Sequence, residues 1–140
     1  MLEKYVENFD AESFVKSYML EKEIKNKQTA ISKLRKEIPL EPYFQDKIKK
    51  KLKDNYKNAY IAKISQGAYS AGGFPDLLMI YKGHYFGFEV KRPVIGVPSE
   101  LQKMTIKKLT IAGGTAAFVI WPEQAVEIVE NWLKENRKGE

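Results

Sequence analysis

The segment from residue 76 to residue 91 constrains the fold more than any other part of the chain. Two runs of strand-forming residues, Asp76–Tyr81 and Tyr85–Lys91, are separated only by Lys-Gly-His. A short Gly-containing loop between two such runs is typical of a β-hairpin. Because side chains alternate along a strand, one face of this hairpin is apolar and should be covered by a helix. That face comprises Leu77, Met79, Tyr81, Phe86, Phe88 and Val90.

The opposite face of the expected hairpin carries charge. With Gly83-His84 as a two-residue loop, Leu78 lies opposite Glu89 and Asp76 lies opposite Lys91. Directly opposed residues in a strand pair have Cβ atoms about 4.5–5.5 Å apart. Asp76, Glu89 and Lys91 are therefore expected to converge at one end of this face, just after the Gly-rich segment 66–75.

Two carboxylates at one point suit a hard divalent cation such as Mg²⁺, which prefers oxygen ligands. Asp76, Glu89 and the backbone carbonyl of Val90 would supply these ligands, and Lys91 would orient a water or stabilise negative charge. The alternative is a surface ion pair worth about 0–1 kcal/mol. A Glu-x-Lys pattern alone has little weight, because Glu23-Ile24-Lys25 is a second copy in a segment expected to be helical.

The rest of the chain alternates between helical and strand patterns. Residues 1–38 lack Gly and Pro and are interpreted as a helical extension, and residues 39–140 are interpreted as one domain. Within that domain we expect helices over 41–57, from Ser99 to Gly113-Gly114 and over 123–136, with further strands over 59–65 and 115–121. This order predicts an α/β fold with a central mixed β-sheet flanked by helices.

Composition excludes several kinds of site. The chain has no cysteine and one histidine, His84, interpreted as a turn residue, so thiolate chemistry and His-rich metal sites are excluded. No apolar run approaches the roughly 20 residues of a membrane span, and Met1–Asn8 has no apolar signal-peptide core. We therefore expect a cytoplasmic protein without membrane association. Gly113-Gly114 follows a helix, unlike a phosphate-binding loop, and we expect no nucleotide cofactor.

The net charge of +6 and the pI near 9.3 suit a polyanionic partner such as nucleic acid. The densest lysine cluster lies on the helix expected over 41–57, and an ordinary solvated helix face is the alternative interpretation. Ser70 in the Gly-rich segment, Lys63 before it and Arg92 after the hairpin are further candidates for phosphate contacts. The full set of candidate nucleic-acid contacts is Lys47, Lys50, Lys51, Lys63, Ser70 and Arg92.

Three motifs in this order resemble the PD-(D/E)xK nuclease superfamily. They are Gly73-Phe-Pro75-Asp76, then Phe88-Glu89-Val90-Lys91, then Ser99-x-x-Gln102. The likeness is greatest to VRR-NUC domains, with archaeal-type Holliday junction resolvases as relatives, and it covers residues 41–121. A basic residue expected after the last strand is replaced by Trp121-Pro122, and residues 1–38 have no counterpart.

The resemblance implies a restriction-endonuclease-like core and Mg²⁺-dependent phosphodiester hydrolysis, with Mn²⁺ as a substitute ion. Asp76 and Glu89 match the metal ligands, Lys91 matches the catalytic lysine, and Gln102 matches a supporting glutamine. Glu41 fits a glutamate that such nucleases carry on the helix before the sheet. An ordinary helix capping box is the alternative for Gln102, and a first-turn acid favoured by the helix dipole is the alternative for Glu41.

We expect an endonuclease that acts on DNA. It would recognise branched, flapped or junction structures, or would have only weak sequence specificity, because phosphate contacts carry no sequence information. Each chain is expected to have one active site, whereas duplex DNA has two strands to cut, and this favours a homodimer. Residues 1–38 are a candidate for the contact between the two copies. One alternative is a nucleic-acid-binding protein that keeps the fold with little or no catalysis. Another is a protein-interaction regulator of a phage or other mobile element.

Overall fold

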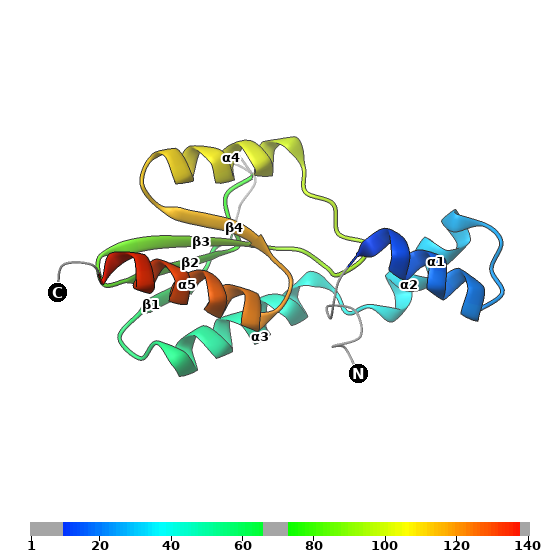
Figure 1. Cartoon of the computed structure of the whole chain (residues 1–140), viewed down its shortest axis with the longest axis horizontal. Coiled ribbons are helices and arrows are strands. Elements are labelled where there is room, and N and C mark those ends of the chain that lie inside the picture. Colours follow the sequence, from blue (N-terminus) through cyan, green and yellow to red (C-terminus); the bar gives the residue numbers. More distant parts are fainter. Residues whose placement is uncertain (1–9, 66–72, 138–140) are drawn as a thin grey trace.

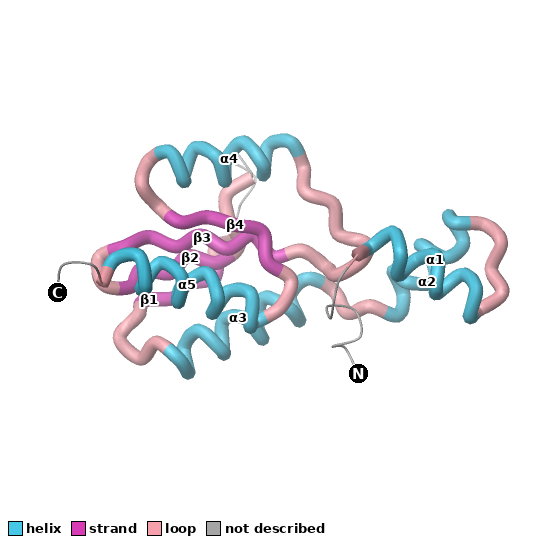
Figure 2. The backbone as a smooth tube through the Cα atoms, viewed as in Figure 1, coloured by secondary structure: helices cyan, strands magenta, loops and turns pink. Residues whose placement is uncertain are grey.

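The computed structural model describes residues 10–65 and 73–137, and within them a single four-stranded sheet forms the centre of the molecule. Its strands lie in the order of the sequence, with β1 antiparallel to β2, β2 antiparallel to β3, and β3 parallel to β4. The sheet is therefore mixed, as expected (Figures 1 and 2). The strands are β1 (Tyr60–Lys63), β2 (Leu77–Tyr81), β3 (His84–Val90) and β4 (Thr115–Val119).

Helices cover both faces of this sheet. In Figure 1, α3 and α5 lie on one face and α4 lies on the other, while α1 and α2 extend beyond one end of the sheet. The helices are α1 (Ala11–Glu21), α2 (Lys27–Glu37), α3 (Glu41–Asn55), α4 (Glu100–Ile111) and α5 (Pro122–Asn136). The α/β class, the restriction-endonuclease-like core and the N-terminal helices are confirmed. Among the described residues, no helix combines the length and apolarity needed to cross a membrane.

The hairpin of β2 and β3 forms with a different register from the one expected. Tyr81 pairs with His84, so the loop is Lys82-Gly83 and not Gly83-His84. Both loop residues have positive φ, 50° and 77°, as a type I′ turn requires. The pairing runs back to Leu77 opposite Phe88, which brings Asp76 level with Glu89 instead of Lys91. Each residue of β2 therefore pairs with a residue two positions earlier on β3 than expected. Because side chains alternate with a period of two, the same residues still share a face of the hairpin.

The apolar face of the hairpin is confirmed. Leu77, Met79, Phe86, Phe88 and Val90 are each 0% exposed. They pack against the buried side chains of α3 and α5, which include Phe44, Ile48, Leu52, Ala125 and Val129. Full burial of a side chain of this size stabilises the fold by roughly 1.5–3 kcal/mol. This face therefore anchors the end of β3 on which the charged residues lie.

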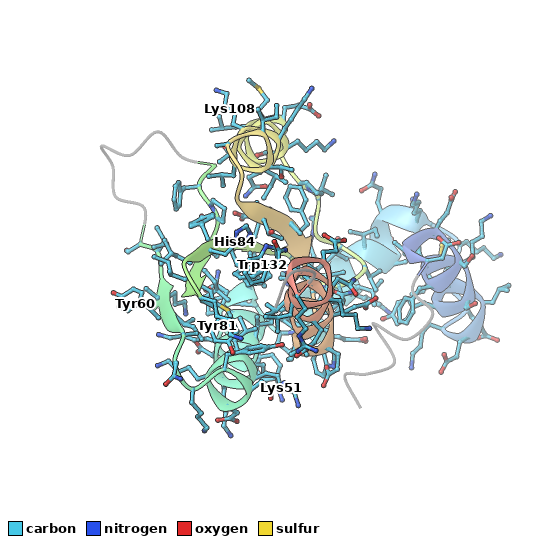
Figure 3. The ribbon with its side chains drawn as sticks, turned by 60° about the vertical axis from the view of Figure 1, so that its left-hand side comes forward. Lys51, Tyr60, Tyr81, His84, Lys108 and Trp132 are labelled. Carbon is cyan, nitrogen blue, oxygen red and sulfur yellow. The ribbon has the colours of Figure 1, made fainter. Side chains whose placement is uncertain are left out.

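His84 is not a turn residue, because β3 begins there. Its Nε2 lies 2.7 Å from Thr115 Oγ1, and its ring stacks on Trp132 with centroids 4.3 Å apart (Figure 3). Burial lowers the pKa of His84 below its usual value. The only histidine thus belongs to the packing between β3, β4 and α5.

The helical extension expected over residues 1–38 is interrupted. After α1 ends at Glu21, Glu23 takes a positive φ of 55°, and α2 starts after Asn26, whose side chain accepts from Gln28 N at 2.7 Å and Thr29 N at 3.3 Å. Asn is among the strongest N-caps, and this cap starts a second helix. The second Glu-x-Lys copy, Glu23 to Lys25, consequently lies in the connecting loop and not in a helix.

The two N-terminal helices pack against each other, and their apolar residues join the core cluster of the molecule. Val15 and Tyr18 of α1 are buried with Ala30 and Leu34 of α2. The Tyr18 hydroxyl donates to Glu37 Oε1 at 2.9 Å across the pair. The helical extension thus forms as a pair of helices in contact with each other.

Candidate metal centre

Three carboxylates from separate elements meet at one end of the sheet. Glu41 occupies the first turn of α3, Asp76 directly precedes β2, and Glu89 lies near the end of β3. One carboxylate oxygen from each lies within 4.8 Å of the others. Glu89 is 2% exposed, whereas Glu41 and Asp76 are half-buried. The fold therefore brings together three of the residues that the sequence pointed to.

Each of two carboxylates is oriented by a hydrogen bond. The Val90 backbone N–H donates to Asp76 Oδ2 at 2.8 Å, and Gln102 Nε2 donates to Glu89 Oε1 at 2.8 Å. The bond from Val90 joins the start of β2 to the end of β3. The Val90 carbonyl, suggested as a metal ligand, stays a prediction.

Gln102 combines the two interpretations that the sequence left open. Its Oε1 accepts from Ser99 N at 2.9 Å, and its backbone N–H donates to Ser99 Oγ at 3.1 Å, which completes the capping box of α4. Because the cap uses Oε1, the amide can turn only its Nε2 donor toward Glu89. The same side chain starts a helix and orients a buried carboxylate.

Glu89 has an unusual environment for an acid. Its Oε2 is buried and has no hydrogen-bond partner among the described residues. An unsatisfied buried acceptor costs about 1–3 kcal/mol, and more if it is charged. Burial, together with the negative charge of Asp76, raises the pKa of Glu89 to about 8, and burial also raises the pKa of Glu41. A divalent cation would satisfy this oxygen and remove the repulsion between the acids, and the all-oxygen donor set fits Mg²⁺ or Mn²⁺.

Lys91 directly follows β3, two residues after Glu89, and its backbone N–H donates to Val119 O at 3.0 Å. Its positive charge acts on both Glu41 and Glu89 and lowers their pKa values, against the larger effect of burial. The lysine thus lies close enough to Glu41 and Glu89 to act on both, and within the described parts of the chain it forms no ion pair with either of them.

Arg92 was suggested as a phosphate contact, and its guanidinium has other partners in the structure. It donates to the backbone carbonyls of Arg35 at 2.7 Å, Ile38 at 2.6 Å and Pro39 at 3.0 Å. These carbonyls lie at the C-terminal end of α2, where a cation is favourable, and in the linker to Glu41. Arg92 therefore connects the end of β3 to the chain that carries Glu41. Its phosphate role stays untested.

We expect Arg92→Lys to destabilise the protein by about 1–3 kcal/mol, because one ammonium cannot replace a planar group that reaches three carbonyls. Looser placement of Glu41 should also weaken Mn²⁺ binding severalfold. Thermal unfolding in EDTA and a Mn²⁺ titration would measure the two effects. Arg35→Lys, at an exposed side chain on α2, is the matched control. Equal stability and equal Mn²⁺ affinity for the two variants would contradict this role.

The lysines suggested as phosphate contacts lie farther along α3 than the acids. At 1.5 Å per residue, Lys47 and Lys51 are roughly 9 and 15 Å from Glu41 along the helix axis. Lys47 Nζ lies over the rings of Tyr43 and Trp121, at 5.2 and 5.6 Å from their centroids. Figure 3 shows Lys51 on α3 and Lys108 on α4, on opposite sides of the sheet.

Lys47, Lys50 and Lys51 line a hollow of about 260 Å³ beside the first turn of α5. Lys63 pairs with Asp46 of α3 at 3.1 Å. Ser70 lies outside the described residues. The contacts of these side chains with nucleic acid stay predictions.

Comparison with known proteins shows a likeness in structure. No protein-family model and no curated protein matches the chain. A solved structure of a VRR_NUC domain is similar, with a TM-score of 0.50 and 25% sequence identity, over 64% of this chain and 94% of that one. The mixed sheet, its flanking helices and this likeness together support a VRR-NUC-like nuclease domain in this chain, consistent with the PD-(D/E)xK superfamily.

Proposed function

We propose that this protein is a metal-dependent endonuclease that hydrolyses phosphodiester bonds of DNA. The observation that carries the proposal is the group of Glu41, Asp76 and Glu89 beside Lys91, with an unpaired buried oxygen on Glu89. The likeness to a VRR_NUC domain supports the same chemistry. An ordinary surface ion pair would not leave a carboxylate oxygen buried without a partner.

In this proposal Asp76, Glu89 and Glu41 hold one or more Mg²⁺ ions, with Mn²⁺ as a substitute. The ion supplies positive charge for the phosphate oxygens and lowers the pKa of an attacking water. Val90 and Gln102 keep two of the carboxylates in place through their hydrogen bonds. Lys91 orients the water or stabilises the negative charge that develops on the phosphate.

The proposed substrate is DNA with a branch, flap or junction, or DNA with only weak sequence preference. Lys47, Lys50 and Lys51 would bind the phosphate backbone beyond the metal centre, and such contacts give affinity that falls steeply with salt. Residues 1–38, treated as an extension of the 39–140 domain, are the candidate contact for a homodimer able to cut both strands. The cytoplasmic location expected from the sequence stays a prediction.

A panel of DNA substrates tests this proposal. Supercoiled plasmid, single strands, flaps and four-way junctions are incubated with the protein in Mg²⁺, Mn²⁺ or EDTA. We expect cleavage in both metals, none in EDTA, and none with Asp76→Ala. The preferred substrate identifies the structure that is recognised.

Two results would redirect the proposal. Salt-sensitive binding without cleavage in any metal would show a nucleic-acid-binding protein with this fold and no useful catalysis. Neither binding nor cleavage would favour a protein-interaction regulator, and a partner of residues 1–38 would then be sought by crosslinking.

A further inference from the structure

A hollow of about 280 Å³ lies directly beside the candidate metal centre. Lys91 forms part of its lining, together with Phe118 and Ile120 from the end of β4. The two sites are adjacent because Phe118 is the residue of β4 that pairs with Glu89 in the parallel register. A substrate whose phosphate reaches the carboxylates and Lys91 therefore has this hollow next to it.

The lining is mainly apolar with a few polar groups. Val94, Phe118 and Ile120 supply apolar walls, and Lys91, Arg92 and Gln124 supply the polar groups. The Arg92 guanidinium is already bonded to the carbonyls of residues 35, 38 and 39. Gln124 Oε1 accepts from Ile120 N at 2.7 Å and from Trp121 N at 3.3 Å. These bonds determine the orientation of the amide, so its Nε2 is a donor of known position. Within residues 10–65 and 73–137 this nitrogen has no hydrogen-bond partner. Apolar walls with few placed polar groups are typical of ligand sites.

One wall of the hollow has a strained backbone. Val94 has a φ of 66°, and a β-branched residue in the left-handed region is a true outlier, costing about 1–3 kcal/mol. The segment is held by Gly96 N donating to Arg92 O at 3.0 Å, where a Cβ on Gly96 would lie 2.5 Å from that oxygen. Arg92 itself donates to backbone carbonyls at the C-terminal end of α2 and in the linker that follows it. Strain maintained by its surroundings concentrates at binding sites.

We propose that this hollow binds the base of one unpaired nucleotide next to the phosphate that is cut, an inference that rests on the proposed nuclease function. Ligand pockets usually have volumes of roughly 300–1,000 Å³, so this one suits a single base and not a base pair. The base packs against Phe118, since stacking on an aromatic ring is the common mode for unpaired bases. Lys91 neutralises the attached phosphate.

The Gln124 donor gives the hollow a chemical preference. Its Nε2 can bond to a carbonyl oxygen on the edge of a base, which thymine, cytosine and guanine have and adenine lacks. The substrate class is therefore DNA with at least one unpaired nucleotide at the cleavage site, as in flaps, gaps and branch points. A fully paired duplex would have to release a base to fill the hollow.

Nuclear magnetic resonance of the full-length protein in EDTA tests this directly. The Ile120 methyl groups and the Gln124 side-chain amide are followed during titrations with thymidine monophosphate, deoxyadenosine monophosphate and inorganic phosphate. We expect thymidine monophosphate to shift both signals with a dissociation constant on the order of millimolar, given the cost of immobilising a small ligand. Deoxyadenosine monophosphate should bind severalfold more weakly. Inorganic phosphate should leave Ile120 unshifted.

Gln124→Glu is the decisive variant, because the new carboxylate still accepts from Ile120 N and Trp121 N but offers no donor to the hollow. We expect it to fold normally and to bind thymidine monophosphate about tenfold more weakly. Gln28→Glu is the matched control, since Gln28 is exposed in the first turn of α2 and an acid is equally favourable there. It should bind like the unchanged protein.

The proposal is overturned if saturating thymidine monophosphate leaves Ile120 unshifted, or if Gln124→Glu binds it as tightly as Gln28→Glu does. Neither measurement needs metal or cleavage. If the protein cleaves DNA but thymidine monophosphate does not bind in the hollow, only this inference is contradicted. If thymidine monophosphate binds in the hollow but the protein cleaves no DNA, only the proposed catalysis is contradicted.

Discussion

Lys91→Met should lower the rate of metal-dependent DNA cleavage by about 100- to 1,000-fold, the usual cost of removing one group that stabilises transition-state charge. Methionine keeps an unbranched chain as far as the ε position and lacks only the ammonium. Lys91 lies beside Glu41 and Glu89, whose pKa values its charge lowers. The measurement is single-turnover cleavage of the preferred substrate at saturating Mg²⁺.

The chain carries its own control for this variant. Lys25 belongs to the second Glu-x-Lys copy, is exposed, and lies in the loop between α1 and α2. Lys25→Met makes the same change in charge and length, and we expect it to cut DNA at the normal rate. If both variants lose activity equally, general loss of positive charge is responsible and Lys91 has no special role.

Glu89→Gln should make the metal-free protein more stable while removing its response to metal. The amide can still accept from Gln102 and no longer places a carboxylate in a buried position without a partner. Removing that penalty of about 1–3 kcal/mol should raise the melting temperature in EDTA by roughly 3–10 °C at this chain length. The unchanged protein should gain stability when Mg²⁺ or Mn²⁺ is added, and the variant should not.

The stability difference should depend on pH in a defined direction. The pKa of Glu89 is about 8 in the folded protein, above the ordinary value of 4.5, so the folded state binds more protons between these values. The stability contributed by the protonated group is complete below about pH 4.5 and is lost as pH rises toward 8. The advantage of Glu89→Gln in EDTA should therefore increase across this range.

Thermal melts at pH 5, 7 and 9 measure this trend, with Glu127→Gln as a control at an exposed acid in the middle of α5. That variant should follow the unchanged protein at every pH. A melting temperature of Glu89→Gln below that of the unchanged protein in EDTA at pH 9 would show that Glu89 is satisfied by contacts other than a metal.

Much of the site could be predicted because many of its side chains lie in short segments whose local structure follows from neighbouring residues. Alternation along the strand expected over 85–91 places Glu89 and Lys91 on one face whatever the register. Ser99 and Gln102 form a capping box through contacts three residues apart. The expected pairing of Asp76 with Lys91 was wrong, because the register of the hairpin depends on which two residues take positive φ, and these are Lys82 and Gly83.

Other features depend on contacts between distant segments. Arg92 reaches carbonyls of residues 35, 38 and 39, and backbone acceptors leave no pattern in side-chain types. The hollow beside Lys91 joins Val94, Phe118 and Gln124, each of which is an ordinary loop, strand or helix residue in the sequence. The break between α1 and α2 did have a signal, since Asn26 is a strong N-cap, and it was outweighed by the absence of Gly and Pro.

The sequence by itself determined the types of ligand atom, the two faces of the hairpin and the helix that starts at Ser99, because strand alternation and helix capping act over a few residues. Only the tertiary structure decided that Glu41 joins Asp76 and Glu89, since the packing of α3 on the sheet brings together residues that are far apart in the chain. It also decided which carboxylate oxygen lacks a partner. Burial and long-range hydrogen bonding depend on the whole fold, and they convert a local pattern of acids into a candidate metal centre.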